Sequence, residues 1–166
     1  MNFLIILVAK YFFIVVILLA LAAFFMTDKT QRKNILKLSF LSLPFSLIIA
    51  KILRLFIYDP RPFAVEHIQP LISHIADNGF PSDHTLLTAT IAAILFQFNK
   101  KLGLILFLLA FLIGLARILA KVHHLTDILG SLGIAIFATY LAWSVPLRFP
   151  KLSVLLENLA SLVVRF

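Results

Sequence analysis

Long apolar runs constrain this chain more than any other feature of its sequence. Five of them approach the roughly 20 residues that an α-helix needs to cross about 30 Å of hydrocarbon. They cover residues 3–26, 35–58, 82–98, 102–120 and 126–145. Hydrophobic residues make up 62% of the chain, far above the share typical of a soluble domain. We therefore predict an all-α fold, a polytopic membrane helix bundle.

The last segment, residues 149–166, leaves the number of transmembrane helices at five or six. It is apolar but short, and it contains Lys151, Glu157 and Arg165, so a sixth span and an amphipathic interfacial helix both fit. The first run is too long for the apolar core of a signal peptide and contains Lys10, so we expect it to stay in the mature protein. We find no polar linker and expect a single membrane-embedded domain over residues 1–166.

The basic residues predict how the bundle is oriented. The formal net charge is +8, but the positive side chains lie between apolar runs and not on a polar surface, which argues against a nucleic-acid partner. Clusters follow the first, third and fifth runs: Lys29, Arg32, Lys33, Lys37, Lys100, Lys101, Arg148 and Lys151. Such turns are typically cytoplasmic. The loop over residues 59–81 and the turn around His123 are then extracytoplasmic.

That opposite side holds most of the chemistry-bearing residues. All five histidines and five of the seven acidic residues lie there. Ionisable groups at membrane depth are costly, and their gathering on one side indicates a functional site. The chain has no cysteine, which excludes a thiolate nucleophile or metal ligand. We also see no carboxylate or cysteine cluster with metal-ligand spacing and expect no metal and no cofactor.

Three arginines predict an anionic ligand. Arg54, Arg61 and Arg117 would repel one another unless an anion lay between them, and the planar guanidinium matches phosphate oxygens. Pro60 and Pro62 flank Arg61 and restrict its backbone. Phosphate is therefore the predicted ligand.

A helix start provides a second part of the site. Pro81-Ser82-Asp83 precedes an apolar run, with Ser82 or Asp83 as the cap, and free N–H groups there favour an anion. Ser82 adds a hydroxyl donor, and His84 in the first turn can protonate a leaving oxygen. Asp83 would repel a phosphate, so we expect it to cap the helix or to keep a histidine protonated.

A histidine–aspartate pair provides the third part. His123 and Asp127 are four residues apart, about 40° around a helix, so both can lie on one face. The carboxylate would then fix the imidazole tautomer. Arg117 and His123 would point apart on a straight helix, so the helix must end between them. His124 is an alternative reactive residue. We expect Lys121 to be a surface anchor, and a polar lid or substrate-entry loop to contain Glu66, His67, His74 and Asp77.

These three clusters resemble the signature motifs of the type 2 phosphatidic acid phosphatase superfamily. Its pattern is Lys-x6-Arg-Pro, Pro-Ser-Gly-His and Ser-Arg-x5-His-x3-Asp, and the matching positions, at the right spacing, are Arg61, Pro62, Pro81, Ser82, His84, Arg117, His123 and Asp127. The resemblance implies that His123 attacks phosphorus, that His84 protonates the leaving oxygen and that Asp127 orients His123. It assigns phosphate binding to Arg54, Arg61, Arg117 and Ser82.

Three positions depart from that pattern. Arg54 replaces the lysine, although Lys51 one turn earlier is an alternative phosphate ligand. Asp83 replaces the glycine, and Ala116 replaces the serine, which removes one hydroxyl donor. The Phe-Pro-Ser-Asp-His variant is similar to the bacterial undecaprenyl diphosphate phosphatase branch of the superfamily.

The resemblance implies a metal-independent enzyme of the bacterial inner membrane that converts undecaprenyl diphosphate to undecaprenyl phosphate. Its only expected partners are the lipid phosphate substrate and membrane lipids. Phosphatidylglycerol phosphate, phosphatidate and the 1-phosphate of lipid A are alternative substrates. A non-catalytic transporter or resistance component is an alternative of another class, although the chain has no repeated, glycine-interrupted spans.

Overall fold

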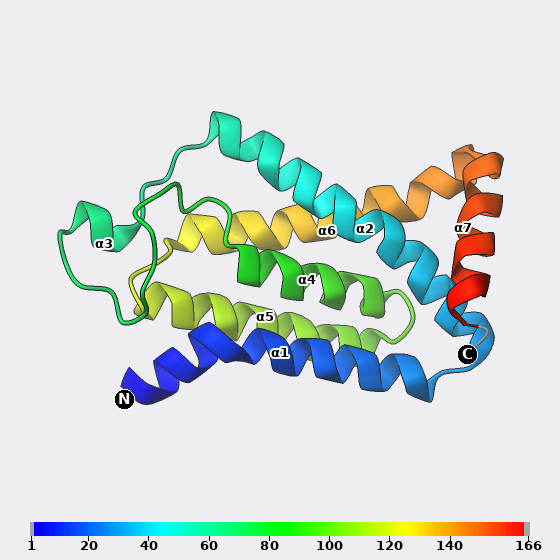
Figure 1. Cartoon of the computed structure of the whole chain (residues 1–166), viewed down its shortest axis with the longest axis horizontal. Coiled ribbons are helices and arrows are strands. Elements are labelled where there is room, and N and C mark those ends of the chain that lie inside the picture. The colour runs from blue at the N-terminus through cyan, green and yellow to red at the C-terminus, as the bar shows by residue number, and fades with distance from the viewer. Residues whose placement is uncertain (1, 165–166) are drawn as a thin grey trace.

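Helices account for nearly all of the described chain. The computed structural model describes residues 2–164, and it contains no named strand in that part of the chain. The helices, shown in Figure 1, are α1 (Asn2–Met26), α2 (Lys29–Phe56), α3 (Pro62–Val65), α4 (Asp83–Phe96), α5 (Lys100–Leu119), α6 (Leu125–Arg148) and α7 (Pro150–Val163). The prediction of an all-α, polytopic membrane bundle is confirmed.

In the described part of the chain, four helices are long and apolar enough to cross a membrane, whereas α4, at the third predicted run, is shorter. The four are α1, α2, α5 and the Leu125–Val145 part of α6. Helix α4 has 14 residues and rises only about 21 Å at 1.5 Å per residue. It packs against α1, α2, α5 and α6. Because protein covers much of its surface, α4 does not have to match the thickness of the bilayer by itself.

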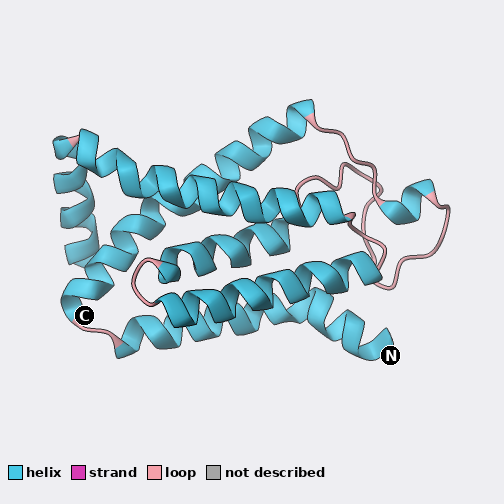
Figure 2. Cartoon of the chain, turned by 180° about the vertical axis from the view of Figure 1, so that it is seen from behind, coloured by secondary structure: helices cyan, strands magenta, loops and turns pink. Residues whose placement is uncertain are grey.

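Helix α7 lies across one end of the bundle. Figures 1 and 2 show it running roughly at right angles to the other helices. Glu157 of α7 accepts a hydrogen bond from Lys37 of α2 at 2.7 Å and faces Lys33 at 3.8 Å. Its 14 residues are too few for an ordinary span. The structure therefore favours the amphipathic alternative for this segment over a sixth transmembrane helix.

Small residues allow the helices to approach one another closely. Ala92 of α4, Ala110 of α5 and Ala135 of α6 are completely buried. Large apolar side chains such as Leu18, Leu108 and Phe137 are instead exposed on the outer surface. Small residues inside and large apolar residues outside are typical of a bundle surrounded by lipid tails.

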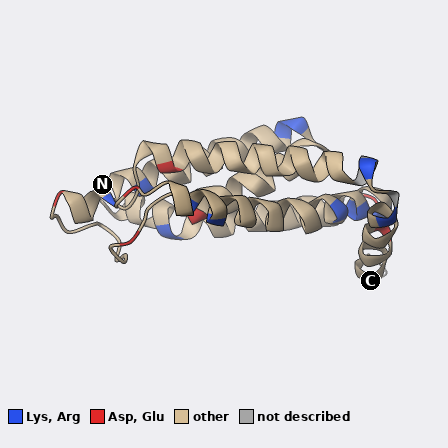
Figure 3. Ribbon diagram, turned by 90° about the horizontal axis from the view of Figure 1, so that it is seen from above, with Lys and Arg blue, Asp and Glu red and all other residues tan. Residues whose placement is uncertain are grey.

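One end of the bundle gathers the polar segments. There α2 and α5 end, α4 and α6 begin, and the loop containing α3 covers them (Figure 1). Figure 3 shows most of the acidic residues at this end and mainly Lys and Arg at the opposite end. Helix α5 stops at Leu119, and Lys121 takes a left-handed backbone conformation with φ 64°. The predicted helix break between Arg117 and His123 is thereby confirmed.

Candidate active site

His123 lies in the turn between α5 and α6 and is the most buried histidine of the site. Its side chain is 2% exposed, and its Nδ1 lies 3.0 Å from Oδ2 of the fully buried Asp127. The pair meets differently from our prediction of one helix face, because His123 precedes α6. Asp127 is in the first turn of α6, and its Oδ2 also accepts the backbone N–H of His124 at 2.9 Å. This cap fixes the turn that carries His123.

The bond to Asp127 leaves the second ring nitrogen of His123 available. When Nδ1 donates to the carboxylate, Nε2 carries the lone pair, and it lies 3.3 Å from Nη1 of Arg61. Burial lowers the pKa of His123, and the nearby charges of Arg117 and Arg61 add to this effect against the opposing Asp127 hydrogen bond. A neutral imidazole with a free nitrogen is the form that a nucleophile requires.

Arg61 is held rigidly beside this nitrogen. It is 4% exposed, its Nε donates to Oδ1 of Asp77 at 2.7 Å, and its Nη1 donates to the carbonyl of Val122 at 2.8 Å. Burial alone would raise the pKa of Asp77, but the hydrogen bond and charge of Arg61 outweigh it and lower that pKa. The guanidinium is thus oriented before any ligand binds.

Arg117 brings a second buried positive charge and ties α5 to α1. Its side chain is 3% exposed, and its Nη1 donates to the carbonyl of Ala9 at 3.1 Å. Its Nε has no acceptor among the described residues. Arg117 lines a pocket together with His84, whose ring meets that of Phe13 edge-on at 4.9 Å. An anion in this pocket would supply an acceptor for the guanidinium.

Ser82 begins α4 as predicted and lies buried against α6. Its Oγ accepts a hydrogen bond from Thr85 at 3.2 Å. The hydroxyl of Ser131 contacts two carbonyl oxygens, that of Ser82 at 3.0 Å and that of Asp127 at 2.7 Å. One serine of α6 therefore fixes the helix start that carries His84 relative to the helix start that carries Asp127.

Arg54 and Asp83 pair with each other. Nη2 of Arg54 lies 3.3 Å from Oδ1 of Asp83, and its Nε donates to the carbonyl of Phe80 at 2.9 Å. Asp83 therefore does not cap α4, because Ser82 holds that position, and its carboxylate pairs with Arg54. Lys51 is exposed on α2 and makes no hydrogen bond or ion pair with any described residue. Phosphate binding by Arg54 or Lys51 stays a prediction.

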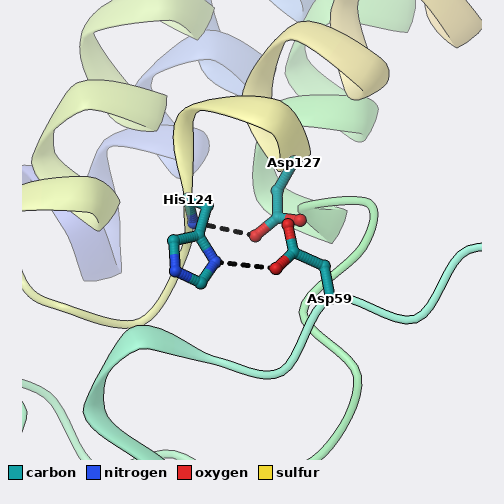
Figure 4. A group of neighbouring side chains, drawn as sticks. All are labelled: Asp59, His124 and Asp127. Atoms are coloured by element: carbon teal, nitrogen blue, oxygen red, sulfur yellow. Dashed lines mark hydrogen bonds and ion pairs between the residues drawn. The ribbon is translucent and has the colours of Figure 1, made fainter. Parts of the chain in front are cut away.

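His124 points to a different partner from His123. Its Nδ1 lies 2.9 Å from Oδ1 of Asp59, and Oδ2 of Asp59 accepts a hydrogen bond from Thr126 at 2.7 Å. Figure 4 shows both carboxylates on the same side of His124, that of Asp127 facing its backbone N–H and that of Asp59 facing its ring. Asp59, His124 and Asp127 have ligand atoms within 4.8 Å of one another, a cluster that the sequence spacing did not indicate. Oδ2 of Asp127 already contacts His123 and His124, and Oδ2 of Asp59 accepts from Thr126, whereas the buried Oδ1 of Asp127 has no hydrogen-bond partner among the described residues. A cation in this cluster would therefore lie next to the His123–Asp127 pair.

The loop before α4 contributes residues whose roles the sequence did not predict. The ring of His74 lies 6.2 Å from that of His123, and burial together with Arg61 and Arg117 lowers the pKa of His74. Oδ1 of Asn78 accepts hydrogen bonds from the backbone N–H groups of Asp59 and Phe80, each at 3.0 Å. The Asn78-Gly79 pair is a turn signal that was available in the sequence. A Cβ at Gly79 would lie 3.0 Å from Oδ2 of Asp127, so glycine permits the close approach.

Lys121 is also more than a surface anchor. Its Nζ lies 3.0 and 3.2 Å from the two carboxylate oxygens of Glu66, which follows α3. The backbone supports this contact, because the carbonyl of Lys121 accepts the N–H of Phe63 at 3.1 Å. The turn that carries His123 is therefore joined to the α3 segment that follows Arg61.

A comparison with protein families identifies the group to which this chain belongs, and it agrees with the site described above. The profile of the PAP2 superfamily matches residues 35–151 of this chain. The chain belongs to the PAP2 superfamily. The matched region contains every residue of the predicted site, and α1, which provides the carbonyl that Arg117 binds, lies outside it.

Two curated relatives and one solved structure are similar to this chain. Undecaprenyl-diphosphatase BcrC of Bacillus subtilis is 31% identical over 165 residues, which cover 99% of this chain and 81% of that protein. Bacitracin transport permease protein BcrC of Bacillus licheniformis is 32% identical over 76% of this chain and 63% of its own length. The crystal structure of Aquifex aeolicus LpxE superposes with a TM-score of 0.65 at 28% identity, covering 86% of this chain and 85% of that one. Together with the family, these similarities make this chain a membrane lipid phosphatase.

Proposed function

We propose that this enzyme hydrolyses undecaprenyl diphosphate to undecaprenyl phosphate through a phosphohistidine at His123. The observation that carries the chemistry is the Nδ1 bond to Asp127, which leaves Nε2 facing Arg61 in a buried, cationic environment. The substrate is supported by the similarity to undecaprenyl-diphosphatase BcrC along 99% of this chain.

In the first step, Nε2 of His123 forms a bond to the terminal phosphorus while the bond from that phosphorus to the bridging oxygen breaks. The electron pair passes to the bridging oxygen, which leaves as part of the lipid monophosphate. His84 donates a proton to that oxygen, and Arg61, Arg117 and Ser82 stabilise the charge on the transferring group. Arg54, or Lys51 in its place, adds a further positive charge to the phosphate site.

In the second step, a water attacks phosphorus and His84 accepts its proton. The phosphorus–nitrogen bond breaks, inorganic phosphate leaves and His123 returns to its neutral form. Asp127 holds the imidazole in one tautomer and stabilises the cation that forms during the transfer. No step calls for a metal ion, because the arginines carry the neutralising charge.

The active site faces the extracytoplasmic side of the inner membrane in this proposal. The support is the asymmetry of basic residues, which follow the first, third and fifth spans at the end of the bundle opposite the site (Figure 3). A lipid carrier diphosphate that is left after sugar transfer outside the cell is accessible from that side.

A substrate panel with purified protein in detergent tests the proposal. We expect kcat/KM for a polyprenyl diphosphate to exceed that for phosphatidate by about tenfold or more, which requires about 1.4 kcal/mol of differential transition-state stabilisation. Equal or faster hydrolysis of phosphatidate, phosphatidylglycerol phosphate or lipid A 1-phosphate under the same conditions would overturn the substrate. Absence of phosphate release from every one of these lipids would instead favour a transporter or resistance component.

A further inference from the structure

A pocket between α1 and the loop before α4 opens beside His84 and Arg117. It has a volume of ≈ 600 Å³. Its polar lining comes from Lys10 and Tyr11 of α1, Ser73 and His74 of the loop, His84 of α4 and Arg117 of α5. Apolar side chains of α1 and of the loop, such as Ile14 and Leu71, form the rest of its wall. One pocket therefore joins an apolar surface to two residues of the proposed phosphate chemistry.

Helix α1 is fixed against this chemistry by two contacts. Arg117 donates to the carbonyl of Ala9 at 3.1 Å, directly before Lys10. The ring of Phe13, one helical turn after Lys10, meets His84 edge-on at 4.9 Å. Lys10 thus lies on the segment of α1 that contacts both Arg117 and His84.

Lys10 is the only charged residue in α1, the most apolar span of the chain. It lies eight residues after the first helical residue, about 12 Å along the helix axis, which makes its charge costly in hydrocarbon. Its Nζ stands 5.3 Å from the ring centre of Tyr11 and forms no ion pair with any described carboxylate. A lysine that only reached for the lipid headgroups would not need to line the pocket of His84 and Arg117.

A lipid diphosphate has a second phosphate, which a phosphate monoester lacks. Its terminal phosphate reacts at His123, and its lipid-linked phosphate lies between the terminal phosphate and the hydrocarbon chain. The chain has to leave toward the bilayer, and the pocket wall on α1 offers an apolar path away from His84. A cation at the start of that path would lie next to the lipid-linked phosphate, ahead of the hydrocarbon chain.

We propose that Lys10, assisted by Tyr11, binds the lipid-linked phosphate of a lipid diphosphate and so selects diphosphates over monophosphates. This inference rests on the proposed function. The bond between the terminal phosphorus and the bridging oxygen breaks with its electron pair on the bridging oxygen, so negative charge grows on the lipid-linked phosphate. The ammonium of Lys10 stabilises this phosphate leaving group. A phosphate monoester has an alkoxide leaving group instead and gains nothing from Lys10.

The test compares wild type with Lys10→Met on two substrates, farnesyl diphosphate and phosphatidate. We expect Lys10→Met to lower kcat/KM for the diphosphate by about tenfold to a hundredfold, the effect of losing one charged hydrogen bond, and to change phosphatidate hydrolysis by less than about twofold. Lys10→Arg should recover most of the loss. Lys101→Met, at the opposite end of the bundle, is the matched control and should behave as wild type.

A second measurement separates a lost subsite from a damaged fold. The inhibition constant of inorganic phosphate, which fills only the reacting site, should be unchanged in Lys10→Met, while that of inorganic diphosphate should rise. If Lys10→Met lowered kcat/KM equally for both substrates, or not at all for the diphosphate, the role of Lys10 would be overturned but the proposed substrate would not. A wild-type enzyme without preference for the diphosphate would overturn the proposed substrate, and the Lys10 inference with it.

Discussion

At the scale of single residues, the site works by fixing charges before the substrate arrives. Arg61 is bound to Asp77 and Val122, and His123 is bound to Asp127. The bonds to Val122 and Asp127 are buried and the bond to Asp77 is partly buried, so they resist competition from water and hold the groups in one geometry. These contacts leave the proposed nucleophile with one ring nitrogen bonded to Asp127 and the other facing Arg61.

The His123–Asp127 bond predicts a pH effect. Burial lowers the pKa of His123 from 6.5, and Asp127 opposes that shift. The acid limb of kcat/KM that belongs to His123 therefore lies below pH 6.5, because activity requires the neutral ring. Asp127→Asn removes the opposing interaction, so the limb should move to still lower pH while kcat falls by about a hundredfold or more from the lost orientation.

This profile is measured with the same substrate for wild type and Asp127→Asn, so that titration of the substrate cancels. Asp59→Asn is the control, because it contacts His124 and leaves His123 bonded to Asp127. A limb that moved to higher pH in Asp127→Asn would contradict the assigned pairing.

The cluster of Asp59, His124 and Asp127 permits a direct test of metal dependence. Oδ2 of Asp127 and Oδ2 of Asp59 already bond to neighbouring residues, Oδ1 of Asp127 has no hydrogen-bond partner among the described residues, and the proposed steps use no cation. Prolonged EDTA treatment should leave turnover within about twofold, since the arginines supply the neutralising charge. Loss of activity that Mg²⁺ or Zn²⁺ restores would show that this cluster holds a required ion.

Sequence spacing identified the motif residues but not the contacts that position them. Arg61, Ser82, His84, Arg117, His123 and Asp127 follow a recognisable order. By contrast, Asp77 reaches Arg61 and His74 reaches His123 only because of the path of the loop before α4, which has no periodic pattern. Long-range pairing of loop residues depends on tertiary structure, so a single sequence does not reveal it.

At the scale of elements, the helix starts and ends determine the site. Hydrophobic runs predicted the spans well, but caps decide the boundaries: Asp28 accepts two N–H groups and starts α2 at Lys29, six residues before the apolar run. At the start of α6, Asp127 accepts the backbone N–H of the cap residue His124, and His123 is left outside the helix. Period-based reasoning places His123 on the helix because it does not see such local bonds.

A glycine of α6 tests how closely the helix start of α4 is packed. A Cβ at Gly130 would overlap the ring of Phe80, which is only 6% exposed, whereas a Cβ at Gly133 meets nothing within 4 Å. Gly130→Ala should lower stability by about 1–3 kcal/mol through overpacking and reduce activity by displacing the segment before Ser82. Thermal unfolding in detergent, followed alongside turnover, measures both effects.

Gly133→Ala is the matched control on the same helix. It should be neutral or should stabilise the protein by up to about 1 kcal/mol, because alanine is the better helix former. Equal behaviour of the two variants would contradict the close contact of Phe80 with α6.

At the scale of the whole molecule, the bundle separates a chemical end from a basic end. The predicted orientation sends the chemical end outside, and the lack of native cysteine makes it testable. In intact cells, a membrane-impermeant thiol reagent should label Gln69→Cys and leave Lys33→Cys unlabelled until the membrane is opened. The reverse labelling pattern would place the site in the cytoplasm.

The central claim is that phosphate passes from the lipid to His123. Rapid quenching with farnesyl diphosphate labelled in its terminal phosphate measures this most directly, and His84→Ala should slow breakdown of the intermediate enough to accumulate it. We expect protein-bound label that is stable in alkali and lost in acid, absent in the His84→Ala/His123→Ala double variant and present in His84→Ala/His124→Ala. Label that persists in the His84→Ala/His123→Ala variant, or that is absent from the His84→Ala/His124→Ala variant, would contradict the account.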